Sequence, residues 1–148
     1  MPIVQRILSA FSAPRPKPLP EPDARLALGA LMVRIAKSDE TYRVEEIQRI
    51  DRILAHANGI GPIDAAKMRA TCERLESHAP ETDDFAALIR DTVPHDGRVE
   101  TLRALWQVLL ADGLERPEEL TVLDATRAAL GLSHEDSAAA RAAATGEG

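Results

Sequence analysis

Apolar side chains recur along this chain every three or four residues, the spacing that places them on one face of an α-helix. The segment 98–111 has the most regular repeat. No stretch alternates apolar and polar residues with period two for long enough to indicate a strand. The sequence therefore predicts an all-α fold, a compact bundle of six to seven helices over residues 22–140. The expected helices cover about residues 22–39, 44–58, 63–78, 82–93, 98–111, 117–130 and a last segment from 133.

Turn and cap residues separate these segments. Gly59 and Gly131 follow apolar helices, where glycine commonly ends a helix in a left-handed conformation. Ser133 and Asp136 have the spacing of a capping box. Asp96-Gly97 is expected to form a turn, and residues 82–84 (Thr-Asp-Asp) are expected to cap the helix that follows them.

The first 21 residues have a different character. Residues 1–12 are predicted to form a short amphipathic helix, and the alternate prolines of residues 13–21 predict an extended, stiff linker. The helix has three possible roles: it folds back onto the domain, it binds a partner, or it lies on a membrane surface through residues 2–12. Residues 141–148, at the other end, are expected to form a frayed tail.

Composition narrows the possible functions. Only 3% of the residues are aromatic while 45% are hydrophobic, so that the core must be aliphatic. The net charge of −6 disfavours nucleic acid as a partner, because Lys and Arg supply most of that affinity. Cys72 is the single cysteine and is expected in the core. A lone cysteine and the lack of a signal pattern favour a cytoplasmic location, with a membrane-peripheral one as the alternative.

Two acidic turns resemble each other. In each turn an aspartate follows one helix, and a pair of glutamates opens the next helix, at Asp39…Glu46 and at Asp112…Glu119. The copies lie about half a domain apart, which predicts two pseudo-symmetric halves. If the halves pack symmetrically, the turns meet at one end of the bundle.

Carboxylates grouped in this way suit a hard cation such as Ca²⁺ or Mg²⁺. The alternative is structural, because glutamate in the first turn of a helix is stabilised by the helix dipole. Arg43 and Arg116 each follow the aspartate by four residues, where a further ligand would be expected, and they count against a tight metal site.

The motifs Ala36-Lys37-Ser38-Asp39…Glu46 and Leu110-Ala111-Asp112-Gly113…Glu119 resemble the twin signatures of the tellurite-resistance protein B-like (TerB-like) family. The resemblance also covers Leu105-Trp106 and residues 130–133. It implies an all-helical domain in two halves and a metal site. The implied metal ligands are Asp39, Glu46, Asp112 and Glu119. The first motif departs from the family pattern, since Glu40 replaces a glycine and Arg43 stands where an acid is common.

No catalytic set is recognisable. The four histidines show no metal-ligand spacing and are expected at the surface or at helix ends; they are His56, His78, His95 and His134. The sequence therefore predicts a non-enzymatic module that binds a divalent cation or a partner protein, or that self-associates, with a family association to tellurite and stress response. A membrane-peripheral scaffold and a metal-dependent enzyme are the alternatives.

Overall fold

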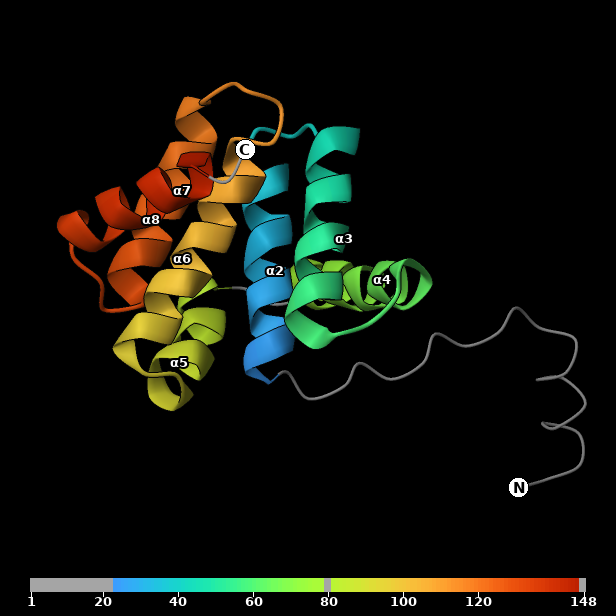
Figure 1. The fold of residues 1–148 in the computed structure, drawn as a ribbon, viewed down its shortest axis with the longest axis horizontal. Coiled ribbons are helices and arrows are strands. Elements are labelled where there is room, and N and C mark those ends of the chain that lie inside the picture. The colour runs from blue at the N-terminus through green and yellow to red at the C-terminus, as the bar shows by residue number, and fades with distance from the viewer. Residues whose placement is uncertain (1–22, 79–80, 147–148) are drawn as a thin grey trace, which may run out of the picture.

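The computed structural model describes residues 23–78 and 81–146. Within them it contains seven helices and no strand, which confirms the all-α prediction (Figure 1). The helices are α2 (Ala24–Lys37), α3 (Val44–Asn58), α4 (Pro62–His78), α5 (Thr82–Thr92), α6 (His95–Leu109), α7 (Pro117–Ala129) and α8 (His134–Gly146). The predicted helix 1–12 and linker 13–21 lie outside the described residues.

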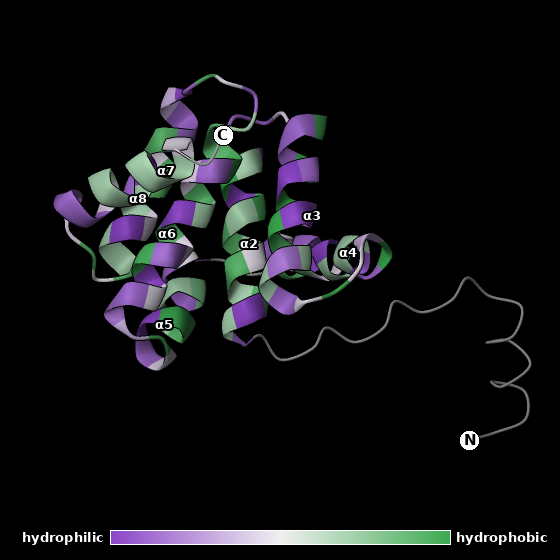
Figure 2. Ribbon diagram, viewed as in Figure 1, coloured by the Kyte–Doolittle hydropathy of each residue, from purple (hydrophilic) through white to green (hydrophobic). Residues whose placement is uncertain are grey.

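Helix α2 lies in the centre of the bundle. It packs against α3, α4, α5, α6 and α7, and an unbroken run from Gly29 to Val33 is buried. A helix that is apolar around most of its circumference is stable only when other helices surround it. Figure 2 shows this apolar helix in the middle, with polar residues on the outer side of α3.

Each half of the molecule contains a helix, an acidic turn and a second helix. These units are α2 with α3 and α6 with α7. Both acidic turns lie at the same end of the bundle, at the top of Figure 1. The predicted meeting of the two turns is therefore confirmed.

Helix boundaries largely follow the predicted cap residues. Gly59 and Gly131 have φ of 61° and 72° and end α3 and α7 in the left-handed region. Ser133 and Asp136 form the expected reciprocal cap: Ser133 N donates to Asp136 Oδ2 (2.9 Å) and Asp136 N donates to Ser133 Oγ (3.0 Å).

Two local predictions were wrong. Asp96-Gly97 is not a turn, because α6 already begins at His95, directly after Pro94. Glycine is needed at position 97 for space, since a Cβ there would lie 2.5 Å from Val93 Cγ1. Residues 82–84 lie inside the first turn of α5, whose N-cap is Glu81. Val44, the first residue of α3, is 62% exposed.

Helices α2 and α4 approach closely at Gly29. A Cβ on this glycine would lie 2.2 Å from Cys72 Sγ and 3.1 Å from Cys72 Cβ. Cys72 is fully buried, as predicted for a core residue. The pair of small residues sets the distance between the two helices.

Helix α8 packs against α6 and continues to Gly146, so that residues 141–146, assigned from sequence to the tail, are helical. The Trp106 indole N–H donates to Ser137 Oγ across this contact (3.1 Å). In the part of the chain that the structure describes, no helix has the length and apolarity needed to cross a membrane.

Candidate functional site

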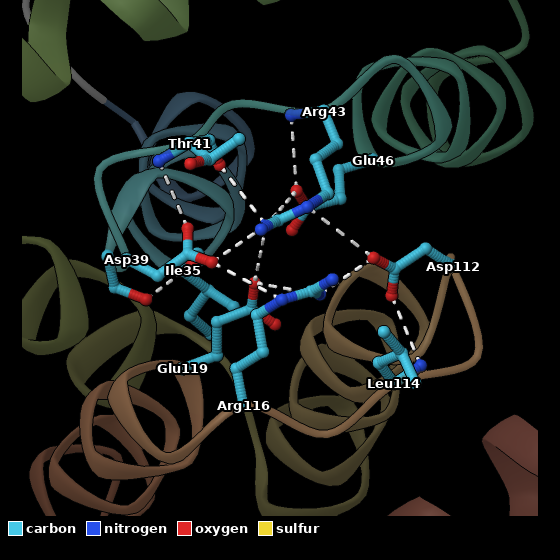
Figure 3. A network of polar contacts seen from close by, with 10 residues as sticks. Ile35, Asp39, Thr41, Arg43, Glu46, Asp112, Leu114, Arg116 and Glu119 are labelled. Carbon is cyan, nitrogen blue, oxygen red and sulfur yellow. Dashed lines mark hydrogen bonds and ion pairs between the residues drawn. The ribbon is translucent and has the colours of Figure 1, made fainter.

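Four carboxylates and two arginines from the acidic turns converge at one end of the bundle, and we call them the acidic cluster (Figure 3). The four carboxylates are the residues predicted as metal ligands. The cluster consists of Asp39, Arg43, Glu46, Asp112, Arg116 and Glu119. The structure thus brings together every predicted site residue.

The two turns have the same local geometry. Asp39 Oδ1 accepts a hydrogen bond from Thr41 N (3.1 Å), and Asp112 Oδ1 accepts one from Leu114 N (3.2 Å). An aspartate that bonds to the backbone two residues ahead tightens a turn. The residue after each aspartate has a positive φ, 67° at Glu40 and 81° at Gly113. The sequence repeat is therefore also a repeat of backbone conformation.

Arg43 contacts all four carboxylates. Its Nη1 lies 2.8 Å from Asp39 Oδ2, 3.6 Å from Glu46 Oε1 and 3.8 Å from Glu119 Oε1. Its Nε lies 3.6 Å from Asp112 Oδ2. One guanidinium group thus bridges the two halves of the molecule.

Arg116 makes the corresponding contacts from the second half. Its Nη1 lies 2.7 Å from Asp112 Oδ2 and 4.0 Å from Glu119 Oε1, and its Nε lies 3.4 Å from Asp39 Oδ2. Figure 3 shows both arginine side chains reaching between the carboxylates. Arg43 and Arg116, which counted against a tight metal site in the sequence analysis, are thus the counter-ions of the four carboxylates in this structure.

Burial separates the glutamates from the aspartates. The side chains of Glu46 and Glu119 are 0% exposed, whereas those of Asp39 and Asp112 are 9% and 12% exposed. The sequence analysis did not predict buried glutamates. A signal was present, because Glu46 precedes the buried Ile50 by four residues and Glu119 precedes the buried Leu123 by four. Both glutamates therefore lie on the apolar face of their helix.

One family model matches the chain over residues 25–142, and its description is tellurite resistance protein TerB. The chain belongs to the TerB family. No curated protein and no solved structure matches it. The TerB match spans α2 through most of α8, including both acidic turns.

The buried glutamates of this TerB domain both have raised pKa values. Burial, together with the charge of the neighbouring Glu46, raises the pKa of Glu119 to about 8. Burial also raises the pKa of Glu46, but the backbone N–H of Arg43, which donates to Glu46 Oε1 (3.2 Å), opposes that effect. A hydrogen bond to the ionised form stabilises it. At neutral pH we therefore place the proton on Glu119, whose pKa lies above 7.

The aspartates of the TerB cluster behave in the opposite way. Burial disfavours the charged forms of Asp39 and Asp112, but the arginines and the turn N–H groups outweigh it. The pKa of each aspartate therefore lies below its usual range. Both remain ionised at neutral pH and hold the guanidinium groups.

The donor set of the TerB cluster suits a hard cation, but the geometry is not that of a ready metal site. Within residues 23–78 and 81–146, no three His, Cys, Asp or Glu side chains are grouped as metal ligands. The guanidinium groups of Arg43 and Arg116 stand between the carboxylates of the two halves. Three buried carboxylate oxygens nevertheless have no hydrogen-bond donor among the described residues, namely Glu46 Oε2 and both oxygens of Glu119.

The four histidines lie apart from this site. Each is exposed, as predicted from their scattered positions. His78 Nδ1 contacts the carbonyl of Arg74 (2.8 Å) at the end of α4, and His95 Nε2 lies 3.2 Å from Asp136 Oδ2. These two have contacts typical of helix ends.

Proposed function

We propose that this TerB-family protein is a non-enzymatic binding module whose acidic cluster binds a divalent cation, Ca²⁺ or Mg²⁺. The three buried carboxylate oxygens without a donor carry the proposal. A buried acceptor without a partner costs free energy, and a cation that it coordinates removes that cost. Ca²⁺ and Mg²⁺ both prefer oxygen ligands, and carboxylates above all.

The charge of the cluster supports the same proposal. Its four carboxylates and two guanidinium groups sum to a formal charge of −2 when all are ionised. A divalent cation neutralises that charge. Because both arginines contact the same carboxylates, the cation must compete with them, and the affinity is expected to be modest.

Calorimetric titration with Ca²⁺, Mg²⁺ and Mn²⁺ at about pH 8.5, above the pKa of Glu119, tests the proposal. We expect a saturable heat in the wild type and a loss of affinity of at least about tenfold in Glu119→Gln. Glu118→Gln is the matched control, since Glu118 lies in the same helical turn but is exposed and outside the cluster. No heat and no change in melting temperature at millimolar metal would contradict the proposal.

A second function, self-association through the same end of the molecule, is favoured by two exposed apolar side chains. Val44 lies within the first acidic turn and Leu114 within the second, and their side chains are 62% and 58% exposed. Apolar groups beside a polar cluster are common at protein interfaces. Light scattering should show concentration-dependent association that the Val44→Ser/Leu114→Ser double variant reduces. A wild type that stays monomeric at all concentrations would exclude this function.

The proposal includes a cytoplasmic location, and it takes tellurite or stress response only as an association of the family. The alternative of a membrane-peripheral scaffold depends on residues 2–12, which lie outside the described part of the chain. Vesicle flotation of the full chain and of a chain starting at Asp23 distinguishes it, because equal behaviour of the two removes a membrane role for those residues.

A further inference from the structure

A groove of about 510 Å³ lies between α3 and α6. None of its lining residues belongs to the acidic cluster, so it is a separate feature. Its volume is within the usual range for small-molecule sites, roughly 300–1,000 Å³. Apolar side chains contribute much of the lining, with Leu28 from α2, Ile53 and Ala57 from α3, and Ala104 from α6.

The charged residues of the groove are mainly basic. Arg49 and Arg52 come from α3, and Arg103 comes from α6, while Glu100 is the acidic lining residue. Their formal sum is +2 with His56 neutral, on a chain whose net charge is −6. Glu100 Oε2 accepts a hydrogen bond from Arg103 Nη1 (2.9 Å), which leaves the positive charge on the α3 side.

Arg49 and Arg52 differ from the other arginines in the described residues. Within residues 23–78 and 81–146 neither makes a hydrogen bond, an ion pair or a ring contact, whereas each of the other described arginines does. Arg49 is half-buried, and its Nε is buried without an acceptor in that part of the chain. A buried donor without an acceptor is costly, so its persistence points to an acceptor supplied from outside.

We propose that this groove binds a small organic anion, a molecule with a phosphate or carboxylate group on an apolar body. Arg49 and Arg52 are three residues apart on α3 and therefore lie on the same helical face. Guanidinium groups bind phosphate and carboxylate oxygens in a bidentate manner. The apolar body lies against Ile53 and Ala104.

Charge argues against two other occupants. Residues 1–22 carry Arg6, Arg15 and Lys17 against Glu21, so the chain's own N-terminal segment is repelled by the groove. A long polyanion such as nucleic acid is repelled by the acidic remainder of the molecule. A small anion contacts only the basic groove and avoids that repulsion.

Titration of the full chain with phenyl phosphate, followed by amide NMR shifts, tests the proposal. We expect saturable shifts for residues of the groove, and weaker binding of inorganic phosphate and of the neutral analogue benzyl alcohol. The Arg49→Gln/Arg52→Gln double variant should lose at least about tenfold in affinity. Arg25→Gln is the control, because Arg25 is exposed, pairs only locally with Asp23, and does not line the groove.

Several results would overturn the proposal: no saturable shift at millimolar phenyl phosphate, equal binding by the double variant, equal binding of benzyl alcohol, or shifts confined to residues outside the groove. If the double variant does not fold, Arg52→Gln alone serves, since Arg52 is exposed and its loss should weaken binding about threefold or more. Glu119→Gln should leave phenyl phosphate binding unchanged, which separates this test from that of the cation site.

Discussion

Glu40 has a left-handed backbone conformation (φ 67°) at the position where the second acidic turn has Gly113 (φ 81°). For a residue with a Cβ this conformation costs roughly 1–2 kcal/mol. The turn retains it because Asp39 is held both by the Thr41 N–H and by Arg43. The first turn thus keeps the geometry of the second at the cost of strain.

Glu40→Gly should raise the free energy of unfolding by about 0.5–1 kcal/mol, since the relief of strain exceeds the added entropy of the unfolded chain. Gly113→Ala should lower it by about 1 kcal/mol for the converse reason. Urea denaturation measures both. A destabilised Glu40→Gly variant would show that the Glu40 side chain matters more than its backbone conformation.

The proton on Glu119 predicts an unusual pH dependence. Between roughly pH 4.5 and 8 the folded state holds a proton on Glu119 that the unfolded state has released. Raising the pH through this window therefore favours unfolding, by up to about 1.4 kcal/mol per pH unit for one proton. The aspartates act oppositely. Because their pKa values are lowered in the folded state, the stability that they contribute is lost only as the pH falls below about 4.

Urea unfolding at pH values from 5 to 9 should thus show the stability of Glu119→Gln rising relative to the wild type as the pH increases. Glu118→Gln changes an exposed side chain in the same turn, and its stability should have the same pH dependence as that of the wild type. Parallel pH profiles for all three proteins would mean that Glu119 is ionised in the folded state.

At the scale of elements, two contacts fix how the helices pack. One is the ionic contact between the α2–α3 turn and the α6–α7 turn, in which Arg43 and Arg116 each bridge to an aspartate of the other half. The other is the close approach of α2 and α4 at Gly29 and Cys72. Sequence periodicity predicted the helices and their order, and the repeated motif predicted that the two turns meet. Neither the arginine bridges nor the Gly29–Cys72 contact was predicted, because both depend on side chains far apart in the chain.

Arg116→Gln should lower the free energy of unfolding by about 1–3 kcal/mol, because it removes one of the two counter-ions of largely buried carboxylates. Arg25→Gln, which removes an exposed pair, should cost less than about 1 kcal/mol. A double-mutant cycle on Arg43 and Asp112 should give a coupling of at least about 0.5 kcal/mol. A coupling of zero would show that the cluster does not hold the halves together.

Gly29→Ala should destabilise the protein by about 1–3 kcal/mol, since its methyl group overlaps Cys72. In a Cys72→Ala background the same substitution should cost clearly less, because the nearest overlapping atom, Sγ, is gone. Thermal and urea unfolding of the four proteins measure this coupling. Equal costs in both backgrounds would indicate that α2 and α4 move apart instead.

At the scale of the whole molecule, the sequence predicted the all-α bundle, the two halves and the four carboxylates that converge. It could not predict that Arg43 and Arg116 insert between them, because each arginine contacts carboxylates of both halves. The α3–α6 groove was also beyond sequence reasoning, since it is formed by side chains of three helices. The sequence therefore did not predict how charges pair across the bundle or where the groove forms.

The cluster links cation binding to pH. Glu119 must lose its proton to coordinate a metal, so cation affinity should rise between about pH 6.5 and 8.5, by up to about tenfold per unit, and level off above the pKa of Glu119. Calorimetry in two buffers of different ionisation enthalpy should detect the released proton below pH 8. A pH-independent affinity without proton release would place the metal elsewhere.

The most direct test is the position of the metal itself. Crystals grown at about pH 8.5, where Glu119 is ionised, can be soaked in Mn²⁺, which like Mg²⁺ prefers oxygen ligands and can be located by anomalous scattering. The proposal predicts an anomalous peak bonded to the oxygens of Glu46 and Glu119, with the guanidinium groups of Arg43 and Arg116 moved away from the glutamates. A map with no peak at the cluster, and with Arg43 and Arg116 still in their present contacts with the carboxylates, would contradict it.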